Sequence, residues 1–237
     1  TDVEELERLA AEGVVSKIDA AQSTPQFGAE SLQFWIQTSD RCNLACTYCY
    51  IPSLNSANAR RPDLFSLFGR KLLGVKGLKS VSIKLAGGEP LLSFEDWCTE
   101  VIELRKTLAE AGIRLNARII TNLTFLTRKI VEYIKVNDIG VSVSLDGLSA
   151  NNDRNRVFPV SGHGSFHVVK KNLEVLRENG IKPGVMITAT SENSAGISAL
   201  VETLVKDDLV FRLSDAKGGH IHPKEFEIAF ADVKRTL

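Results

Sequence analysis

The chain has 237 residues, 43% of them hydrophobic, and its 29 Lys and Arg balance 29 Asp and Glu. This length can bury the core of one α/β barrel, and the balanced charge gives no support to a nucleic-acid partner or to capture by an anionic membrane. Because no apolar run nears the roughly 20 residues that span a bilayer, and the acidic start is unlike a signal peptide, we expect a cytoplasmic protein.

The first 30 residues predict an N-terminal helix and linker that precede the main domain, residues 31–237. Apolar residues recur at helical spacing over residues 3–15, with acidic residues on the opposite face. Residues 21–30 are rich in turn formers and read as a linker. The sequence does not begin with Met, so we expect that part of the protein lies outside it.

From Ser31 onward, alternating apolar runs and runs with helical spacing take turns. The predicted strands centre on residues 32–36, 81–85, 117–119, 141–145, 185–189 and 211–213, and the predicted helices on residues 64–72, 94–108, 130–134, 166–176, 197–204 and 226–237. Gly180 ends the fourth of these helices. Six such units predict an α/β fold, a partial (β/α)6 TIM-like barrel of parallel strands with outer helices.

The alternation within the strands predicts an unusually polar barrel interior. If the apolar residues face the helices, the other set points inward, whereas a packed barrel interior is apolar and branched. We therefore expect an open, incompletely closed barrel that holds a ligand. The predicted inward residues are Gln33, Gln37, Lys84, Arg118, Ser142, Ser144, Thr188 and Arg212.

Three of the four cysteines lie within eight residues, as Cys42, Cys46 and Cys49 in a C-x3-C-x2-C motif. Thiolates are the usual ligands of iron-sulfur clusters, and three of them on a 4Fe-4S cube leave one iron free to bind a further molecule. A zinc site built from three thiolates and one His is the alternative, although zinc sites more often pair their cysteines as C-x2-C. Crowded cysteines of this kind indicate metal ligands rather than disulfides.

Polar or glycine-rich segments follow the other predicted strands. Parallel α/β sheets bind ligands at the carboxyl ends of their strands, so these segments predict one shared site. The glycine pair lets a backbone approach closely, although a Gly-Gly turn before an acid is often only a loop. The segments are Gly87-Gly88-Glu89-Pro90, Thr121-Asn122, Ser144-Leu145-Asp146-Gly147 and residues 188–193.

The order of these motifs resembles that of radical S-adenosylmethionine (radical SAM) enzymes, in particular the peptide-modifying branch of sulfatase-maturase-like, SPASM-type and RiPP maturase enzymes. The resemblance covers about residues 31–215. It implies that Cys42, Cys46 and Cys49 hold a 4Fe-4S cluster and that Gly87-Gly88-Glu89 contacts the amino group of SAM. It also implies that Ser144 and Arg156 hold the SAM carboxylate and ribose, which suits the fork geometry of a guanidinium. The implied cofactor-binding residues are Tyr48, Gly87, Gly88, Glu89, Asn122, Ser144, Asp146, Arg156, Thr188 and Leu213.

Other interpretations of single residues stay open at this point. Arg154 and Arg156 could instead pair with Asp146 and Asp153 to brace the loop. Cys98 lies on a helix face between apolar residues and is expected to be a small buried hydrophobe. His220 and His222 have metal-ligand spacing, but an exposed turn is the simpler expectation.

The sequence departs from the family pattern at several places. Leu123 follows Asn122 where many relatives have Gly, and Ala86 precedes the glycine pair where peptide-modifying relatives often have a polar residue. SPASM and twitch extensions need further cysteines, and none follows Cys98. Either a C-terminal extension lies outside this sequence, or the protein works with one cluster.

The resemblance implies an enzyme in which SAM chelates the free iron and is cleaved reductively, giving a 5'-deoxyadenosyl radical that abstracts hydrogen from the substrate. The expected substrate is a ribosomal precursor peptide that is crosslinked or otherwise modified, and a flavodoxin- or ferredoxin-type protein is the expected electron donor. The alternatives are a radical SAM enzyme acting on a small molecule in cofactor biosynthesis and a zinc-stabilised binding protein without catalysis. No residue stands out as a catalytic base or radical quencher.

Overall fold

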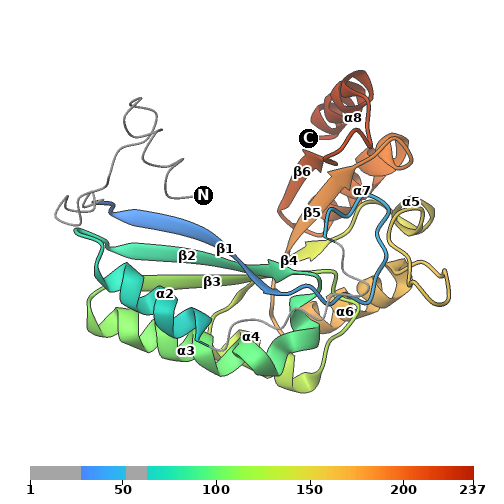
Figure 1. Ribbon diagram of the computed structural model, residues 1–237. Helices are drawn as coiled ribbons and strands as arrows, with labels where there is room; N and C mark the ends of the chain where they lie inside the picture. The colour runs from blue at the N-terminus through green and yellow to red at the C-terminus, as the bar shows by residue number, and fades with distance from the viewer. Residues whose placement is uncertain (1–27, 52–62) are drawn as a thin grey trace, which may run out of the picture.

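The computed structural model describes residues 28–51 and 63–237, and its centre is a parallel sheet (Figure 1). The predicted helix over residues 3–15 and most of the predicted linker lie outside this described part, so the domain division at residue 30 stays a prediction. The strands are β1 (Ser31–Ser39), β2 (Ser80–Gly87), β3 (Arg114–Thr121), β4 (Gly140–Ser144), β5 (Gly184–Ala189) and β6 (Phe211–Asp215). The helices are α2 (Leu64–Leu73), α3 (Phe94–Glu110), α4 (Arg128–Val136), α5 (Ser149–Asp153), α6 (Phe166–Glu178), α7 (Ile197–Lys206) and α8 (Pro223–Thr236), with 3-10 turns η1 (Pro90–Ser93) and η2 (Ser194–Gly196).

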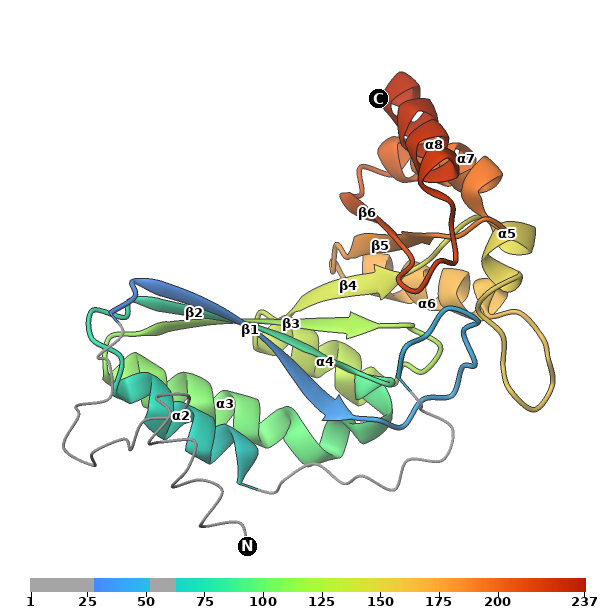
Figure 2. The same ribbon diagram turned by 45° about the horizontal axis from the view of Figure 1, so that its top comes forward.

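The six strands follow one another in sequence order across the sheet, and each pairs in parallel with the next. β1 and β6 therefore form the two edges, and the sheet curls without closing. Figures 1 and 2 show β1–β3 forming one arm and β4–β6 rising to form the other, with the helices outside. The predicted α/β half-barrel of six units is confirmed.

The helix-facing side of the sheet carries the core because apolar residues alternate along each strand. Val81, Ile83 and Leu85 of β2 are at most 1% exposed, and they share this buried cluster with Trp97 and Val101 of α3. Full burial of one such side chain contributes roughly 1.5–3 kcal/mol. The apolar stripe of each outer helix therefore fixes it against the convex side of the sheet.

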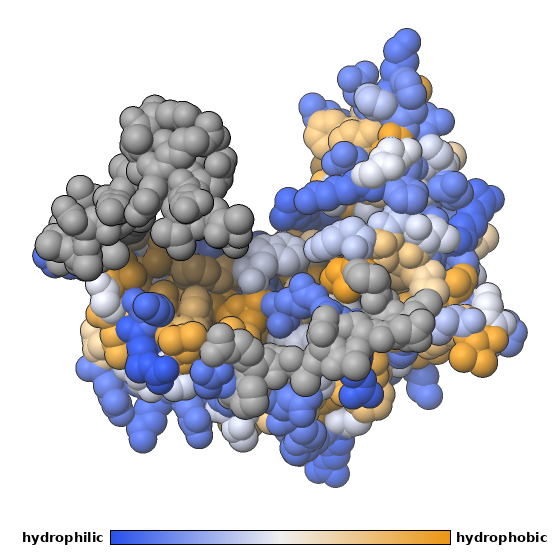
Figure 3. Space-filling model, in the orientation of Figure 1, coloured by the Kyte–Doolittle hydropathy of each residue, from blue (hydrophilic) through white to orange (hydrophobic). Residues whose placement is uncertain are grey.

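The concave side of the sheet is polar and accessible, as the alternation predicted. Gln33 and Gln37 of β1, Arg118 of β3 and Arg212 of β6 are exposed, and Lys84 of β2 is half-buried. The space-filling view shows the surface hollowed between the two arms of the sheet (Figure 3). An interior open to this degree leaves room for ligands against the sheet.

The short elements α5, η1 and η2 were not predicted. Each has five or fewer residues, which is too short for a helical period to show in the sequence. All three follow the carboxyl ends of strands, where they shape the loops of the site. In the part of the chain that the structure describes, no helix is long and apolar enough to cross a membrane.

Candidate functional site

A cavity of about 240 Å³ lies at the carboxyl ends of β1–β4 and gathers nine of the thirteen predicted site residues. They come from the loop after β1, the ends of β2, β3 and β4, and the segment after α5. Parallel strand ends converge in this way in α/β barrels, so residues far apart in sequence share one space. The nine residues are Cys42, Cys46, Cys49, Tyr48, Gly87, Gly88, Asn122, Ser144 and Arg156.

The cysteine loop begins at an irregularity in β1. Gln37 lies opposite Ala86 and Ser39 lies opposite Gly87, so one extra residue, Thr38, is accommodated in β1. Thr38 is 1% exposed, and its hydroxyl donates to the carbonyl of Ala86 at 3.2 Å. Bulges of this kind redirect a strand next to functional sites, and this one sends the chain from the sheet into the loop.

The cysteine loop is fastened to the segment that follows α5. The Ala45 N–H donates to Val157 O at 2.8 Å, and the Thr47 N–H donates to Asn155 O at 3.1 Å. The Thr47 hydroxyl also donates to Asn155 Oδ1 at 2.6 Å. Two loops 108 residues apart thus form one structural unit around the cavity.

Cys42, Cys46 and Cys49 line the cavity together, and the first two are half-buried. Burial raises the pKa of the Cys46 thiol to about 11, which the nearby Arg156 guanidinium partly offsets, and burial likewise raises the pKa of Cys42. Among the described residues, no three His, Cys, Asp or Glu side chains are gathered closely enough to share one metal ion. The ligand roles of the three cysteines therefore stay a prediction.

The glycine pair has a structural role in addition to the predicted close approach to a ligand, which stays a prediction. A Cβ on Gly88 would lie 2.2 Å from the carbonyl oxygen of Arg41, and one on Gly87 would lie 2.3 Å from that of Ser39. Gly87 also has a φ of 138°, which favours glycine. The Gly88 N–H donates to Ser39 O at 2.7 Å, and the Glu89 N–H donates to Arg41 O at 2.7 Å. The glycines therefore seat the start of the cysteine loop as well as lining the cavity.

Glu89 points into the protein rather than into the cavity. Its side chain is fully buried and accepts from the Leu91 N–H at 3.0 Å, the Thr121 hydroxyl at 2.6 Å and the Asn122 N–H at 2.6 Å. Burial raises the pKa of Glu89 to about 7, although these three donors favour the carboxylate. In this structure the Glu89 side chain ties the end of β2 to the end of β3, and the implied contact of this segment with SAM stays a prediction.

Asn122 joins the end of β3 to the cysteine loop. Its side-chain amide donates to Asn43 Oδ1 at 3.1 Å and to the Cys42 sulfur at 3.7 Å. The next residue, Leu123, has a φ of 53° although it is not a glycine, and it is 1% exposed. A left-handed backbone, which glycine adopts without strain, is therefore kept here by a buried Leu, at a cost of roughly 1–2 kcal/mol.

Asp146 is the centre of a buried network behind the cavity. Its carboxylate accepts from Arg156 Nε at 2.6 Å, from the Thr188 N–H at 2.8 Å and from the Tyr48 hydroxyl. The Arg156 guanidinium also lies 5.6 Å from the centre of the Tyr48 ring and donates to the Cys46 sulfur at 3.8 Å. Arg156 therefore braces the loop, as the alternative interpretation held, and reaches the cavity as well.

The remaining predicted residues lie outside the cavity. Thr188 is held by Asp146, and Leu213 packs against the hydrophobic core. Their contacts with a cofactor stay predictions, as do the ligand roles of the other predicted residues. Arg154 donates to the carbonyl of Glu192 at 2.6 Å instead of pairing with an acid.

Two further expectations concern cysteine and histidine. Cys98 is buried in the core at 6% exposure, as predicted. His220 is exposed, and His222 accepts from the Lys224 N–H at 3.3 Å and caps α8. Neither histidine belongs to a metal-binding group among the described residues.

Sequence reasoning missed two asparagines that hold the site together. Asn193 is fully buried, and its amide donates to the carbonyls of Asp146 at 3.0 Å and Thr188 at 2.8 Å. Asn155 accepts from Thr47 and donates to the Thr190 hydroxyl at 2.8 Å. Asn193 lies in the segment 188–193 that the sequence predicted as part of the site, and Asn155 adjoins Arg156, but no local pattern identifies their distant partners.

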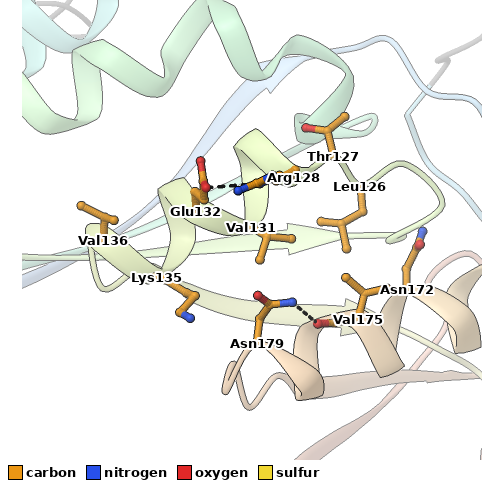
Figure 4. Close-up of a pocket in the computed structure, with 10 residues that line it drawn as sticks. All are labelled: Leu126, Thr127, Arg128, Val131, Glu132, Lys135, Val136, Asn172, Val175 and Asn179. Atoms are coloured by element: carbon orange, nitrogen blue, oxygen red, sulfur yellow. Dashed lines mark hydrogen bonds and ion pairs between the residues drawn. The ribbon is translucent and has the colours of Figure 1, made fainter.

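A second hollow, of about 640 Å³, lies between α4 and α6 in the outer helical layer (Figure 4). Arg128 and Glu132 form an ion pair of 3.4 Å at its rim, and the Asn179 amide donates to the carbonyl of Val175 at 2.9 Å. It contains none of the predicted site residues. We assign it no part in the site.

The fold and the cavity define a class of protein, an open parallel half-barrel with three cysteines in the loop after its first strand. The family model of the Radical SAM superfamily matches residues 36–201, which is most of the described chain. The chain belongs to the radical SAM superfamily.

Curated relatives and solved structures agree with this family. The chain is 25% identical over 207 residues to the cysteine-type anaerobic sulfatase-maturating enzyme of Clostridium novyi, covering 80% of this chain and 54% of the relative. It is 30% identical over 173 residues to the Fe-coproporphyrin III synthase of Methanosarcina barkeri, covering 71% and 40%. The chain thus spans about half the length of the curated relatives it matches.

Two of the solved structures share the fold. The structure of native anSMEcpe with bound AdoMet has a TM-score of 0.75 at 19% identity and covers 86% of this chain and 59% of that one. The structure of Streptococcus suis SuiB bound to precursor peptide SuiA has a TM-score of 0.59 at 20% identity, covering 90% and 51%. These likenesses establish the fold of this chain.

Proposed function

We propose that this chain is the catalytic half-barrel of a radical SAM enzyme that acts on a peptide. The observation that carries the proposal is the single cavity in which three cysteines adjoin the glycine pair, Asn122, Ser144 and Arg156. In this proposal Cys42, Cys46 and Cys49 hold a 4Fe-4S cluster. When bound, the cluster and SAM supply a one-electron cleavage of SAM and the hydrogen abstraction that follows it.

The side chains that line the cavity suit these groups chemically. Cys42, Cys46 and Cys49 supply three thiols to one cavity, enough to bind three irons of a cube, whereas a structural zinc site needs a fourth protein ligand. Arg156 brings a guanidinium to the cavity lining, and a guanidinium suits a carboxylate such as that of SAM. Asp146 holds Arg156 and Tyr48 in place, so the cofactor wall is preorganised.

Substitution of single cysteines tests the metal assignment. After anaerobic reconstitution we expect about 4 irons per chain and reductive cleavage of SAM. Cys46→Ala should lose both, whereas Cys98→Ala, the same change at a cysteine in the core, should keep both. Colourless protein with one zinc per chain, or SAM cleavage by the Cys46→Ala variant, would contradict the proposal.

A peptide substrate is supported by the relatives named as sulfatase-maturating enzymes and by the fold shared with SuiB bound to its precursor peptide. The assay is anaerobic incubation with SAM, reductant and candidate precursor peptides, followed by mass spectrometry of the peptide. A mass change that depends on SAM is the expected result. A flavodoxin- or ferredoxin-type electron donor belongs to the same proposal, and replacing a chemical reductant with such a protein tests it.

A second candidate is an enzyme of small-molecule cofactor biosynthesis. The relative named Fe-coproporphyrin III synthase, at 30% identity, favours it. Incubation with a porphyrin substrate in place of the peptide separates the two, because only one class of substrate should be converted.

A further inference from the structure

The concave face of the sheet bears four cationic residues and, within the six strands, no acidic one. The strand registers place Trp35, Lys84 and Arg118 side by side across β1–β3, and Ser80 opposite Arg114. Arg212 of β6 lies opposite Met186 of β5 on the same face. Since the whole chain has no net charge, this face concentrates positive charge where the half-barrel is open.

Two cavities adjoin on this face. The cysteine-lined cavity includes Gln37 of β1 and Ala86 of β2. Another cavity, of about 670 Å³ and separate from the hollow between α4 and α6, includes Gln33 of β1 and Ser82 of β2. Its charged lining residues are Lys84, Arg105, Arg114, Arg118 and Asp138. The cavities meet at Trp35 and Lys84, which lie opposite each other. Gln33 and Gln37 lie four residues apart along β1, as do Ser82 and Ala86 along β2, or about 13 Å at roughly 3.3 Å per residue.

Lys84 and Arg118 lie directly opposite each other on neighbouring strands, an arrangement that is destabilising for like charges. Among the described residues, no ion pair joins Lys84, Arg114, Arg118 or Arg212 to an acid. A Cβ on Gly140 would lie 3.1 Å from the Arg118 guanidinium. The glycine thus leaves room for the guanidinium to cross β4. A bound anion would relieve the repulsion.

An apolar contact is available beside these charges. Trp35 is 52% exposed on the same face and lines the cysteine cavity, and the Lys84 ammonium lies 5.2 Å from the centre of its ring. A large exposed aromatic next to cations suits a chain that offers both side-chain carboxylates and apolar surface. A peptide has this combination.

We infer that this concave face, named here the cationic face (Lys84, Arg114, Arg118 and Arg212 with Trp35), binds an acidic segment of the substrate peptide. The acidic residues would lie within about four residues of the residue that reacts, because an extended peptide advances about 3.3–3.6 Å per residue and so covers the 13 Å from Gln33 to Gln37 or from Ser82 to Ala86. This inference rests on the proposed function. It specifies the substrate as a peptide with Asp or Glu near its modified residue.

Peptide binding by the full chain tests the inference without any turnover. The probes are labelled peptides of about 12 residues, long enough to span both cavities, which carry three Glu, three Gln or three Lys in one otherwise shared sequence. By fluorescence anisotropy we expect the Glu peptide to bind at least about tenfold more tightly than the Gln peptide. Its affinity should fall as salt rises, because salt screens exposed charges.

Charge-removing variants test whether the cationic face, rather than other Lys and Arg residues of the chain, causes the preference for the Glu peptide. Lys84→Gln combined with Arg118→Gln should remove the preference for Glu over Gln. The control, Lys106→Gln with Lys171→Gln, removes the same charge from exposed positions on the outer helices α3 and α6 and should leave the preference intact. The charge-reversed pair Lys84→Glu with Arg118→Glu should prefer the Lys peptide, a reversal that a merely destabilised protein would not show. Thermal unfolding of each variant identifies any that fails to fold.

Several outcomes would overturn the inference. Equal binding of the Glu and Gln peptides would do so, as would a preference that the Lys84 and Arg118 variants retain. Tighter binding of an RNA oligonucleotide would assign the face to nucleic acid. Residues 1–27 carry six acidic and two basic residues. If a peptide of that sequence displaced the Glu probe more strongly than unlabelled Glu peptide does, the face would belong to the chain's own N-terminal segment.

SAM cleavage is measured separately in the same preparations. Cleavage without a Glu preference would reject the inference and keep the proposed function. A Glu preference without iron or SAM cleavage would reject the proposed function instead.

Discussion

Gly88→Ala should dislodge the start of the cysteine loop. The added Cβ would lie 2.2 Å from Arg41 O and 2.6 Å from Asp40 O, so the two backbones must separate by roughly 1 Å to reach ordinary contact. That movement stretches the hydrogen bonds from Gly88 N–H to Ser39 O and from Glu89 N–H to Arg41 O, both 2.7 Å. At about 1 kcal/mol for each hydrogen bond and about 1–3 kcal/mol for overpacking, the free energy of unfolding should fall by roughly 3–5 kcal/mol.

Denaturant unfolding of the cluster-free protein, measured anaerobically, gives the free energy of unfolding, and iron per chain after reconstitution reports the state of the loop. The matched control is Gly74→Ala. Its Cβ would meet its nearest neighbour, Lys71 O, at an ordinary 3.4 Å, and its φ is −81°. The control should unfold with unchanged or slightly higher free energy. If Gly88→Ala unfolded like the control and bound the same amount of iron, the role assigned to the glycine pair would be refuted.

Three further changes test the network behind the cavity. Leu123→Gly should cost about 1 kcal/mol less stability than Leu123→Ala, because φ at this residue is 53° and glycine relieves the strain. If Leu123→Gly were instead less stable than Leu123→Ala, the left-handed backbone assigned to this residue would be contradicted. Asp146→Asn should lower the free energy of unfolding by about 3 kcal/mol or more, because it leaves the buried Arg156 guanidinium without its counter-ion, and a loss below about 1 kcal/mol would count against a buried pair. Glu89 has its pKa raised from 4.5 to about 7, so its protonated form favours folding. Its contribution is complete below pH 4.5 and is lost as the pH rises through 7. Wild type should therefore lose stability between pH 5 and 8 relative to Glu89→Gln, and parallel pH profiles of the two proteins would contradict the shift.

The barrel could be predicted because apolar residues recur along each strand and each outer helix with the spacing typical of that element. Val81, Ile83 and Leu85 alternate along β2, and Trp97, Val101 and Leu104 recur along α3, so local spacing identifies both elements and the face each one buries. Sequence order then coincides with spatial order across the sheet. Little beyond these periods was needed to derive the architecture.

The interior of the site was less predictable because it depends on distant side chains. The cysteines, the glycine pair and Asn122 could be expected together, since all follow strand ends. The hydrogen bonds between Glu89 and Thr121 and between Asn193 and Asp146 could not be predicted, because hydrogen bonds between distant residues leave no local pattern. The departure at Leu123 was visible in the sequence, but its left-handed backbone was not.

The fastening of the cysteine loop bears on the order in which the protein is made. Cys46 emerges during synthesis 110 residues before Arg156, whose guanidinium reaches its sulfur, and Thr47 emerges 108 residues before its partner Asn155. Until the chain beyond β4 has been translated and folded, the loop around Cys46 lacks its contacts with Asn155, Arg156 and Val157. If these cysteines hold the proposed cluster, its assembly waits for the first four strands, and a nascent chain ending before residue 155 should acquire no stable iron.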